Sequence, residues 1–303
     1  MSDSLSHRDL IDPKVVARLA ALPLHSRLPM LGNVSGRHQS PHRGSSIEFA
    51  EYRKYVPGDD PRRLDWRAYA RSDRHYIKEF EADTNLRLHL VVDASASMGF
   101  TSSLASKFDF ARKVAASLAY LTIQGGDAVG LTTCSEKITR DIPALRRPSH
   151  LQALFAALRE ARPKGGTGLV PSLHELAERV RQRALVVVFS DLFLEPDEFK
   201  DALRHLRFNR HDVAVFQLFD RQELEFQFDR PMRFVDMETG SALPLEPRLI
   251  ADRYHNSLER HVEAVRSACL GANADYHQVV TDEDYGDLLA DFLMARLPKK
   301  GRR

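Results

Sequence analysis

An apolar run that stops at an acidic residue occurs three times in this chain of 303 residues. The runs are Leu86–Asp93, Ala184–Asp191 and Val213–Asp220. Ala184–Asp191 is fully apolar up to its polar end, as a central strand buried on both faces of a parallel sheet requires. Stretches with helical periodicity, such as Phe108–Leu121 and Pro196–Phe208, separate the runs. The sequence therefore predicts an α/β fold: a doubly wound, mostly parallel sheet with helices on both faces.

Composition limits the class of protein further. Charged residues make up 28% and hydrophobic residues 43%, which is ordinary for a soluble globular protein. The net charge of +2 is too small to indicate nucleic acid as a partner. We find no apolar stretch long enough to span a membrane and no signal-peptide core, so we expect a cytoplasmic protein. Cys134 and Cys269 fall in predicted elements and are expected to be buried and reduced.

The chain is predicted to have three parts. Residues 1–46 hold an amphipathic helix and a mobile basic loop, and residues 47–85 hold a charge-dense flap and an accessory strand. The α/β domain spans residues 86–303 and carries a β insertion at about 223–246. We expect this insertion to pair with the strand at 76–83 in a small accessory sheet.

The flap contains the single tryptophan among alternating charges. Two interpretations of it remain open: a recognition surface for a partner, or an ion-paired cover packed onto the main domain. Its candidate partner-binding residues are Asp59, Asp60, Arg62, Arg63 and Trp66.

Side chains that carry oxygen atoms cluster at the ends of the predicted strands. Asp93, Ser95 and Ser97 follow the first run, Asp191 ends the second, and Thr167 lies in a glycine-rich loop. Loops after neighbouring parallel strands converge on one crevice, so these five residues can meet. Two carboxylates and three hydroxyls suit a hard cation, Mg²⁺ first and Mn²⁺ or Ca²⁺ next. The sequence therefore predicts a metal site at this edge of the sheet.

This set of residues resembles the metal-ion-dependent adhesion site of von Willebrand factor A domains. The residues that carry the resemblance are Asp93-Ala-Ser95-Ala-Ser97, Thr167 within a Gly-Gly-Thr loop, and Ser190-Asp191 after an apolar strand.

The upstream stretch Glu48–Trp66 narrows the resemblance. It is similar to the signature of a bacterial family, domain of unknown function fifty-eight, whose members carry a von Willebrand A-like domain. The resemblance covers roughly residues 35–245. It departs from the wider pattern at Leu192, where glycine is usual, and we expect this change to alter the third loop without removing Asp191.

The resemblance implies that Ser95, Ser97 and Thr167 bind the metal directly, and that Asp93 and Asp191 act through water. Neutral ligands leave the charge of a metal poorly compensated, so an open position attracts a carboxylate from a partner. The implied function is that of a non-catalytic, metal-dependent protein-interaction module. Relatives often stand beside AAA ATPases of the MoxR type, so the resemblance implies an adaptor for such an ATPase or its client, in the assembly or maturation of other proteins.

Two alternatives remain. Ser95-Ala-Ser97-Met-Gly99 differs from the Gly-x-Ser-x-Gly motif of serine hydrolases only at its first glycine, which would make Ser97 a nucleophile. Against this, His211 opens a predicted strand and His255 and His261 lie within a predicted helix, so none occupies an obvious loop after the last strand. In the second alternative, the polar residues are strand ends and helix caps in a degenerate A domain with a purely structural site.

Overall fold

The computed structural model describes residues 10–27, 48–54, 76–81, 86–103, 105–228 and 230–297. The chain forms two compact units, one of residues 1–27 and 87–303 and one of residues 28–86. In the second unit, β1 (Glu48–Lys54) pairs antiparallel with β2 (Tyr76–Glu81). The candidate flap residues, Asp59 to Trp66, lie outside the described residues.

The first unit is built on a six-stranded sheet with the order β10-β7-β6-β3-β4-β5. Every pairing in this sheet is parallel except that of β5, an edge strand antiparallel to β4. This arrangement confirms the predicted doubly wound fold. The strands are β3 (Arg87–Asp93), β4 (Ala128–Cys134), β5 (Ile138–Leu145), β6 (Leu185–Ser190), β7 (Asp212–Phe219) and β10 (Asp275–Val280).

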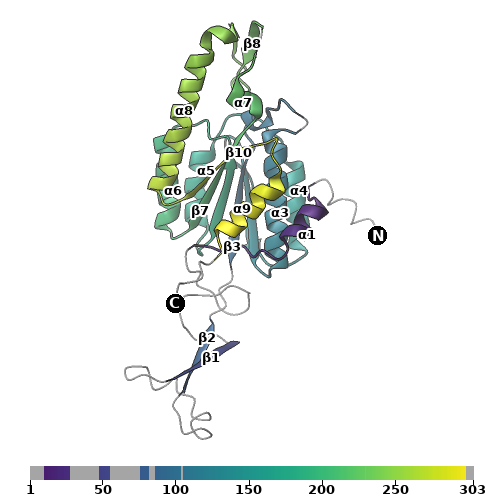
Figure 1. Ribbon diagram of the computed structural model, residues 1–303, viewed down its shortest axis with the longest axis vertical. Coiled ribbons are helices and arrows are strands. Elements are labelled where there is room, and N and C mark those ends of the chain that lie inside the picture. The colour runs from purple at the N-terminus through teal and green to yellow at the C-terminus, as the bar shows by residue number, and fades with distance from the viewer. Residues whose placement is uncertain are drawn as a thin grey trace. The chain divides into compact units, whose positions relative to one another are not determined.

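Helices cover both faces of this sheet (Figure 1). On one face, α5, α6 and α8 pack over an apolar core that includes Val186 and Val188 of β6. On the other face lie α1, α3, α4 and α9. The helices are α1 (Pro13–Leu19), the 3-10 helix η2 (Ala96–Gly99), α3 (Lys107–Gln124), α4 (His150–Glu160), α5 (Leu169–Arg179), α6 (Pro196–Phe208), α7 (Arg221–Glu225), α8 (Pro247–Gly271) and α9 (Tyr285–Ala295). Within the described residues, no helix combines the length and the apolar character needed to cross a membrane.

The switch point of the sheet lies between β3 and β6, which pair directly. The chain leaves β3 for α3 on one face and leaves β6 for α6 on the other. Ligands of open α/β sheets bind outside the carboxyl ends of the strands at such a point. Asp93 ends β3 and Asp191 follows β6, so both acidic residues lie at this position.

A buried ion cluster holds the amino ends of β7 and β10. Asp212 accepts hydrogen bonds from the Arg27 backbone N–H at 2.8 Å and from the Arg296 guanidinium at 2.8 Å. Arg296 also bonds Asp275 at 2.6 Å. The end of the first segment of the unit, residues 25–27, is therefore fixed beside the first residue of β7.

The β insertion forms its own hairpin. Within it, β8 (Met232–Val235) pairs antiparallel with β9 (Ala242–Leu245), while β2 pairs with β1. The prediction that the insertion pairs with the strand at 76–83 was wrong. A hairpin closes a shorter loop than a pairing between distant segments, so its entropic cost is lower. Figure 1 shows β8 beside the first turns of α8 and near α7.

Candidate functional site

One carboxylate connects the three predicted loops. Asp93 is 1% exposed, and its Oδ1 atom accepts the Ser95 backbone N–H at 2.8 Å. Its Oδ2 atom accepts the Ser190 hydroxyl at 2.7 Å and the Thr167 hydroxyl at 3.3 Å. The loops after β3 and β6 and the glycine-rich loop before α5 therefore converge on the same two oxygen atoms.

The hydroxyls of the first loop lie next to each other. The Oγ atoms of Ser95 and Ser97 are 3.2 Å apart, and Ser95 is fully buried. The Ala96 backbone N–H donates to the Gly165 carbonyl at 2.9 Å, which fixes this loop against the glycine-rich loop. The backbone thus holds both serines close to Thr167.

Close backbone contact explains the glycines around Thr167. The Gly168 backbone N–H donates to the Ser135 carbonyl at 2.5 Å. A Cβ atom at position 168 would overlap the Glu136 carbonyl group. Gly165 has φ +70°, a conformation that side chains disfavour. Thr167 reaches Asp93 because its loop packs this closely onto the end of β4.

Asp191 is paired with a buried lysine. The Lys107 Nζ atom donates to Asp191 Oδ2 at 2.8 Å and to Glu223 Oε1 at 2.5 Å, and Lys107 is 0% exposed. Burial alone lowers the pKa of Lys107, but attraction to Asp191 and Glu223 outweighs it and raises the pKa overall. Lys107 is therefore a permanent cation at one side of the site.

Leu192 adopts the backbone conformation that glycine favours. Its φ is +56° and its side chain is 0% exposed. The carbonyl of Leu192 accepts a hydrogen bond from His261 Nε2 at 2.8 Å. The left-handed turn typical of glycine is thus present after Asp191, and packing of the buried leucine offsets its strain.

A second carboxylate approaches the site from the β8–β9 hairpin. Glu238 contacts the Ser97 side chain and the Thr167 backbone through hydrogen bonds. A Cβ atom on Gly166 would lie 3.6 Å from Glu238 Oε2. Burial raises the pKa of Glu238, and repulsion from Asp191 adds to the effect.

The charges and donor atoms of the site fit a hard divalent cation. Burial, followed by repulsion from Asp191, raises the pKa of Asp93 to about 6. All candidate ligands are oxygen atoms, as Mg²⁺ prefers. Among the residues that the structure describes, no three His, Cys, Asp or Glu side chains gather as a group that could hold a metal ion.

Sequence reasoning missed Lys107, Glu223 and Glu238 as site residues. Lys107 is the first residue of α3, where a lysine is normally solvated, and Glu238 lies in a polar turn. Neither position carries a sequence signal, because the contacts of each depend on segments far away in the chain.

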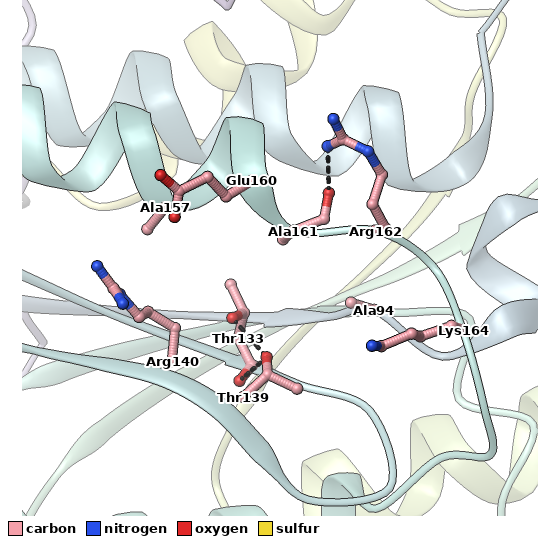
Figure 2. Close-up of a pocket in the computed structure, with 9 residues that line it drawn as sticks. All are labelled: Ala94, Thr133, Thr139, Arg140, Ala157, Glu160, Ala161, Arg162 and Lys164. Carbon is pink, nitrogen blue, oxygen red and sulfur yellow. Dashed lines mark hydrogen bonds between the residues drawn. The ribbon is translucent and has the colours of Figure 1, made fainter.

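A pocket of about 240 Å³ lies behind the first loop (Figure 2). Ala94 lines it, and the Ala94 carbonyl accepts the Lys164 backbone N–H at 2.9 Å. The side chain of Lys164 extends over this space in Figure 2, while the Arg162 guanidinium bonds the Ala161 carbonyl. The charged residues of its lining are Arg140, Arg162, Lys164 and Glu160.

Comparison with known proteins gives a family and a set of relatives. The family model described as "Protein of unknown function DUF58" matches residues 51–264. A Mycobacterium tuberculosis protein, "Uncharacterized protein Rv1480", is 29% identical over 97% of this chain and 93% of its own length.

Two solved structures are also similar. They are "conserved hypothetical protein BatB" from Bacteroides thetaiotaomicron, at 12% identity and TM-score 0.49, and the "SpRpn10 VWA domain", at 10% identity and TM-score 0.40. The matches cover 70% of this chain and 98% of BatB, and 69% of this chain and 95% of the VWA domain.

Proposed function

The chain belongs to the DUF58 family of proteins of unknown function, and on that premise we propose that it is a non-catalytic, metal-dependent protein-interaction module. The observation that carries the proposal is the convergence of three loops on the Asp93 carboxylate. A buried carboxylate surrounded by hydroxyls at a switch point is an arrangement suited to a small hard cation.

In this proposal, Ser95, Ser97 and Thr167 are the direct ligands of Mg²⁺, with Mn²⁺ or Ca²⁺ as alternatives. Asp93 and Asp191 would act through water: they would orient the hydroxyls and balance the charge of the metal. When bound, the metal would offer an incompletely neutralised positive charge to a carboxylate of another protein. Hydrogen bonds from Ser190 and Thr167 keep Asp93 in position for this task.

The proposed partner is an AAA ATPase of the MoxR type or its client, which this chain would serve as an adaptor in assembly or maturation. The support for this partner is the family resemblance of residues 48–66 and the acceptor chemistry of the site. No nucleic acid and no membrane span are part of the proposal.

Titration calorimetry with Mg²⁺ and Mn²⁺ tests the metal site. Wild type should release or absorb heat with one-site stoichiometry, and both Asp93→Ala and Thr167→Ala should lose that signal. Thr139→Ala is a matched control, because it removes a hydroxyl from the neighbouring edge strand and should bind like wild type. Equal heats for wild type and Asp93→Ala, with circular dichroism showing all variants folded, would refute metal binding at this site.

A pull-down with purified MoxR-type ATPase from the same genome tests the adaptor role. Capture should require Mg²⁺ and should fall on addition of chelator or in Thr167→Ala. Capture that is indifferent to both treatments would show that the contact lies elsewhere on the chain.

The serine hydrolase alternative has a separate test. Among the described residues, the Ser97 hydroxyl contacts Ser95 and Glu238, and neither supplies the imidazole base of a hydrolase triad. A fluorophosphonate should therefore leave Ser97 unlabelled. Covalent labelling of Ser97 that is independent of metal would favour the hydrolase instead.

A further inference from the structure

We propose that Glu238 is an internal carboxylate ligand, held at the place where an acidic side chain of a partner would bind the metal. The β8–β9 hairpin would then close the site until a partner displaces it. This inference rests on the proposed metal-dependent function and adds to it a residue and a form of regulation.

The turn of the hairpin is built to present Glu238. Asp236 Oδ1 accepts the Glu238 backbone N–H at 2.8 Å and the Thr239 backbone N–H at 3.3 Å. The Thr239 hydroxyl donates to Asp236 Oδ2 at 2.7 Å. These bonds fix the turn locally, so little further ordering is needed to position the Glu238 side chain.

The tip of the hairpin rests on two of the three site loops. Glu238 contacts Ser97 and Thr167, as described above, and is half-buried in a turn whose other residues are mostly exposed. The Cε atom of its neighbour Met237 would lie 3.6 Å from a Cβ atom on Gly99. The hairpin therefore contacts the site through more than one residue, Met237 as well as Glu238.

Electrostatics favour a cation between Glu238 and the rest of the site. Asp191 repels Glu238, and Asp93 and Asp191 also repel each other. Lys107 donates hydrogen bonds to Asp191 and to Glu223. A carboxylate held against this repulsion is in the position expected for a metal ligand.

In this proposal, the base of the hairpin stays attached to the domain while its tip moves away from the metal site. An aromatic cluster fixes the base: Phe226 stacks on Tyr254 at a centroid distance of 4.1 Å and on Phe234 at 5.7 Å. Towards the tip, Val235 and Met237 are 53% and 45% exposed. These apolar side chains would give a partner a second contact while its carboxylate replaces that of Glu238.

Mn²⁺ binding followed by water proton relaxation tests the inference. Glu238→Ala should bind Mn²⁺ at least roughly tenfold more weakly than wild type, because loss of a ligand should cost no less than loss of a group that supports one. Its bound Mn²⁺ should also give a higher proton relaxation rate, because water replaces the lost carboxylate. Added acetate should lower that rate in Glu238→Ala and leave wild type unchanged.

Glu246→Ala is the matched control. Glu246 is an exposed acid at the other end of β9, and its side chain makes no cap hydrogen bond to α8. This variant should match wild type in affinity, relaxation rate and response to acetate.

The outcomes separate this inference from the proposed function. If wild type and Glu238→Ala bind Mn²⁺ with the same affinity and relaxation rate, Glu238 is not a ligand, and the metal site stands. If neither wild type nor Glu238→Ala binds Mn²⁺, both the proposed function and this inference are refuted.

Discussion

The Nζ atom of Lys107 lies 2.8 Å from Oδ2 of Asp191, and both side chains are buried. Removing one partner of a buried ion pair leaves an uncompensated charge, which costs about 3–5 kcal/mol. Lys107→Met keeps much of the side-chain volume but leaves Asp191 and Glu223 without the cation that they pair with. We expect this variant to lose about 3 kcal/mol of unfolding free energy in urea titrations.

Two controls accompany the Lys107 prediction. Lys113→Met changes a half-exposed lysine of the same helix and should shift stability by less than about 0.5 kcal/mol. Adding Glu223→Gln to Lys107→Met should recover part of the loss. A Lys107→Met variant as stable as wild type would contradict the electrostatic role of this pair.

At position 192, we expect glycine to be tolerated better than alanine in terms of folding stability. Truncation of a buried leucine costs about 2–5 kcal/mol, and a left-handed conformation costs a non-glycine residue about 1–2 kcal/mol. Wild type should therefore be the most stable, Leu192→Gly intermediate and Leu192→Ala the least stable, since alanine loses the packing and keeps the strain. Urea denaturation of the three proteins measures the order, and a more stable Leu192→Ala than Leu192→Gly would contradict it.

Gly168→Ala should disturb the Thr167 loop. The new Cβ atom would overlap the Glu136 carbonyl, so the loop must move, and we expect a loss of about 1–3 kcal/mol together with weaker Mn²⁺ binding. Gly271→Ala at the end of α8 is the control, because its nearest neighbour atom, Cε of Lys200, would lie at 3.5 Å, an ordinary contact. Thermal melts and Mn²⁺ titrations of the two variants test this prediction. Similar stability and Mn²⁺ affinity of both would show that overlap with the Glu136 carbonyl does not disturb the loop.

We expect the buried His89 to make the free energy of unfolding depend on pH. Burial, opposed in part by attraction to Asp141, lowers its pKa to about 4. Between pH 6.5 and about 4 the unfolded chain binds a proton at this histidine and the folded chain does not. Stability therefore falls as the pH falls through this window, by about 3 kcal/mol from this group at 1.36 kcal/mol per pKa unit.

The measurement for His89 is the difference between wild type and His89→Gln in urea titrations from pH 8 to pH 4. The His89 Nε2 atom bonds the Thr132 hydroxyl at 2.8 Å, a contact that glutamine can replace. The variant should lose less stability than wild type on acidification. Parallel profiles would show that another group controls the acid response.

The parts predicted from sequence are those with local or periodic signals. Each apolar run folded as a strand of the sheet because only burial on both faces suits such a run. The ends of β3 and β6 brought Asp93 and Asp191 to one crevice because the order of parallel strands requires it. Thr167 also reaches Asp93, but its loop joins α4 to α5 and follows no strand, so the close packing of its glycines onto the end of β4 brings it there.

The parts that escaped prediction depend on distant contacts. The partner of Lys107 is set by the packing of α3 against the loop after β6, which no local pattern records. Glu238 is one acid among many, and its place follows from the direction in which the β8–β9 hairpin leaves the domain. The hairpin itself was predicted, but its pairing with β2 was wrong, because both strands had closer partners.

The hydrogen bonds of Ser26 and Arg27 to Asp212 define where the chain leaves the sheet domain. It leaves beside the first residue of β7 and returns at Arg87, the first residue of β3. Asp212 of β7 pairs with Leu185 of β6, and Leu185 pairs with Leu88 of β3. The points where the chain leaves the domain and re-enters it therefore lie two strands apart, at the same end of the sheet. Neighbouring strands are about 4.8 Å apart, so roughly 10 Å separates them, a span that a linker of about four to six residues covers. We therefore expect a chain with a short linker in place of residues 28–85 to retain the sheet and the five predicted metal-site residues, Asp93, Ser95, Ser97, Thr167 and Asp191.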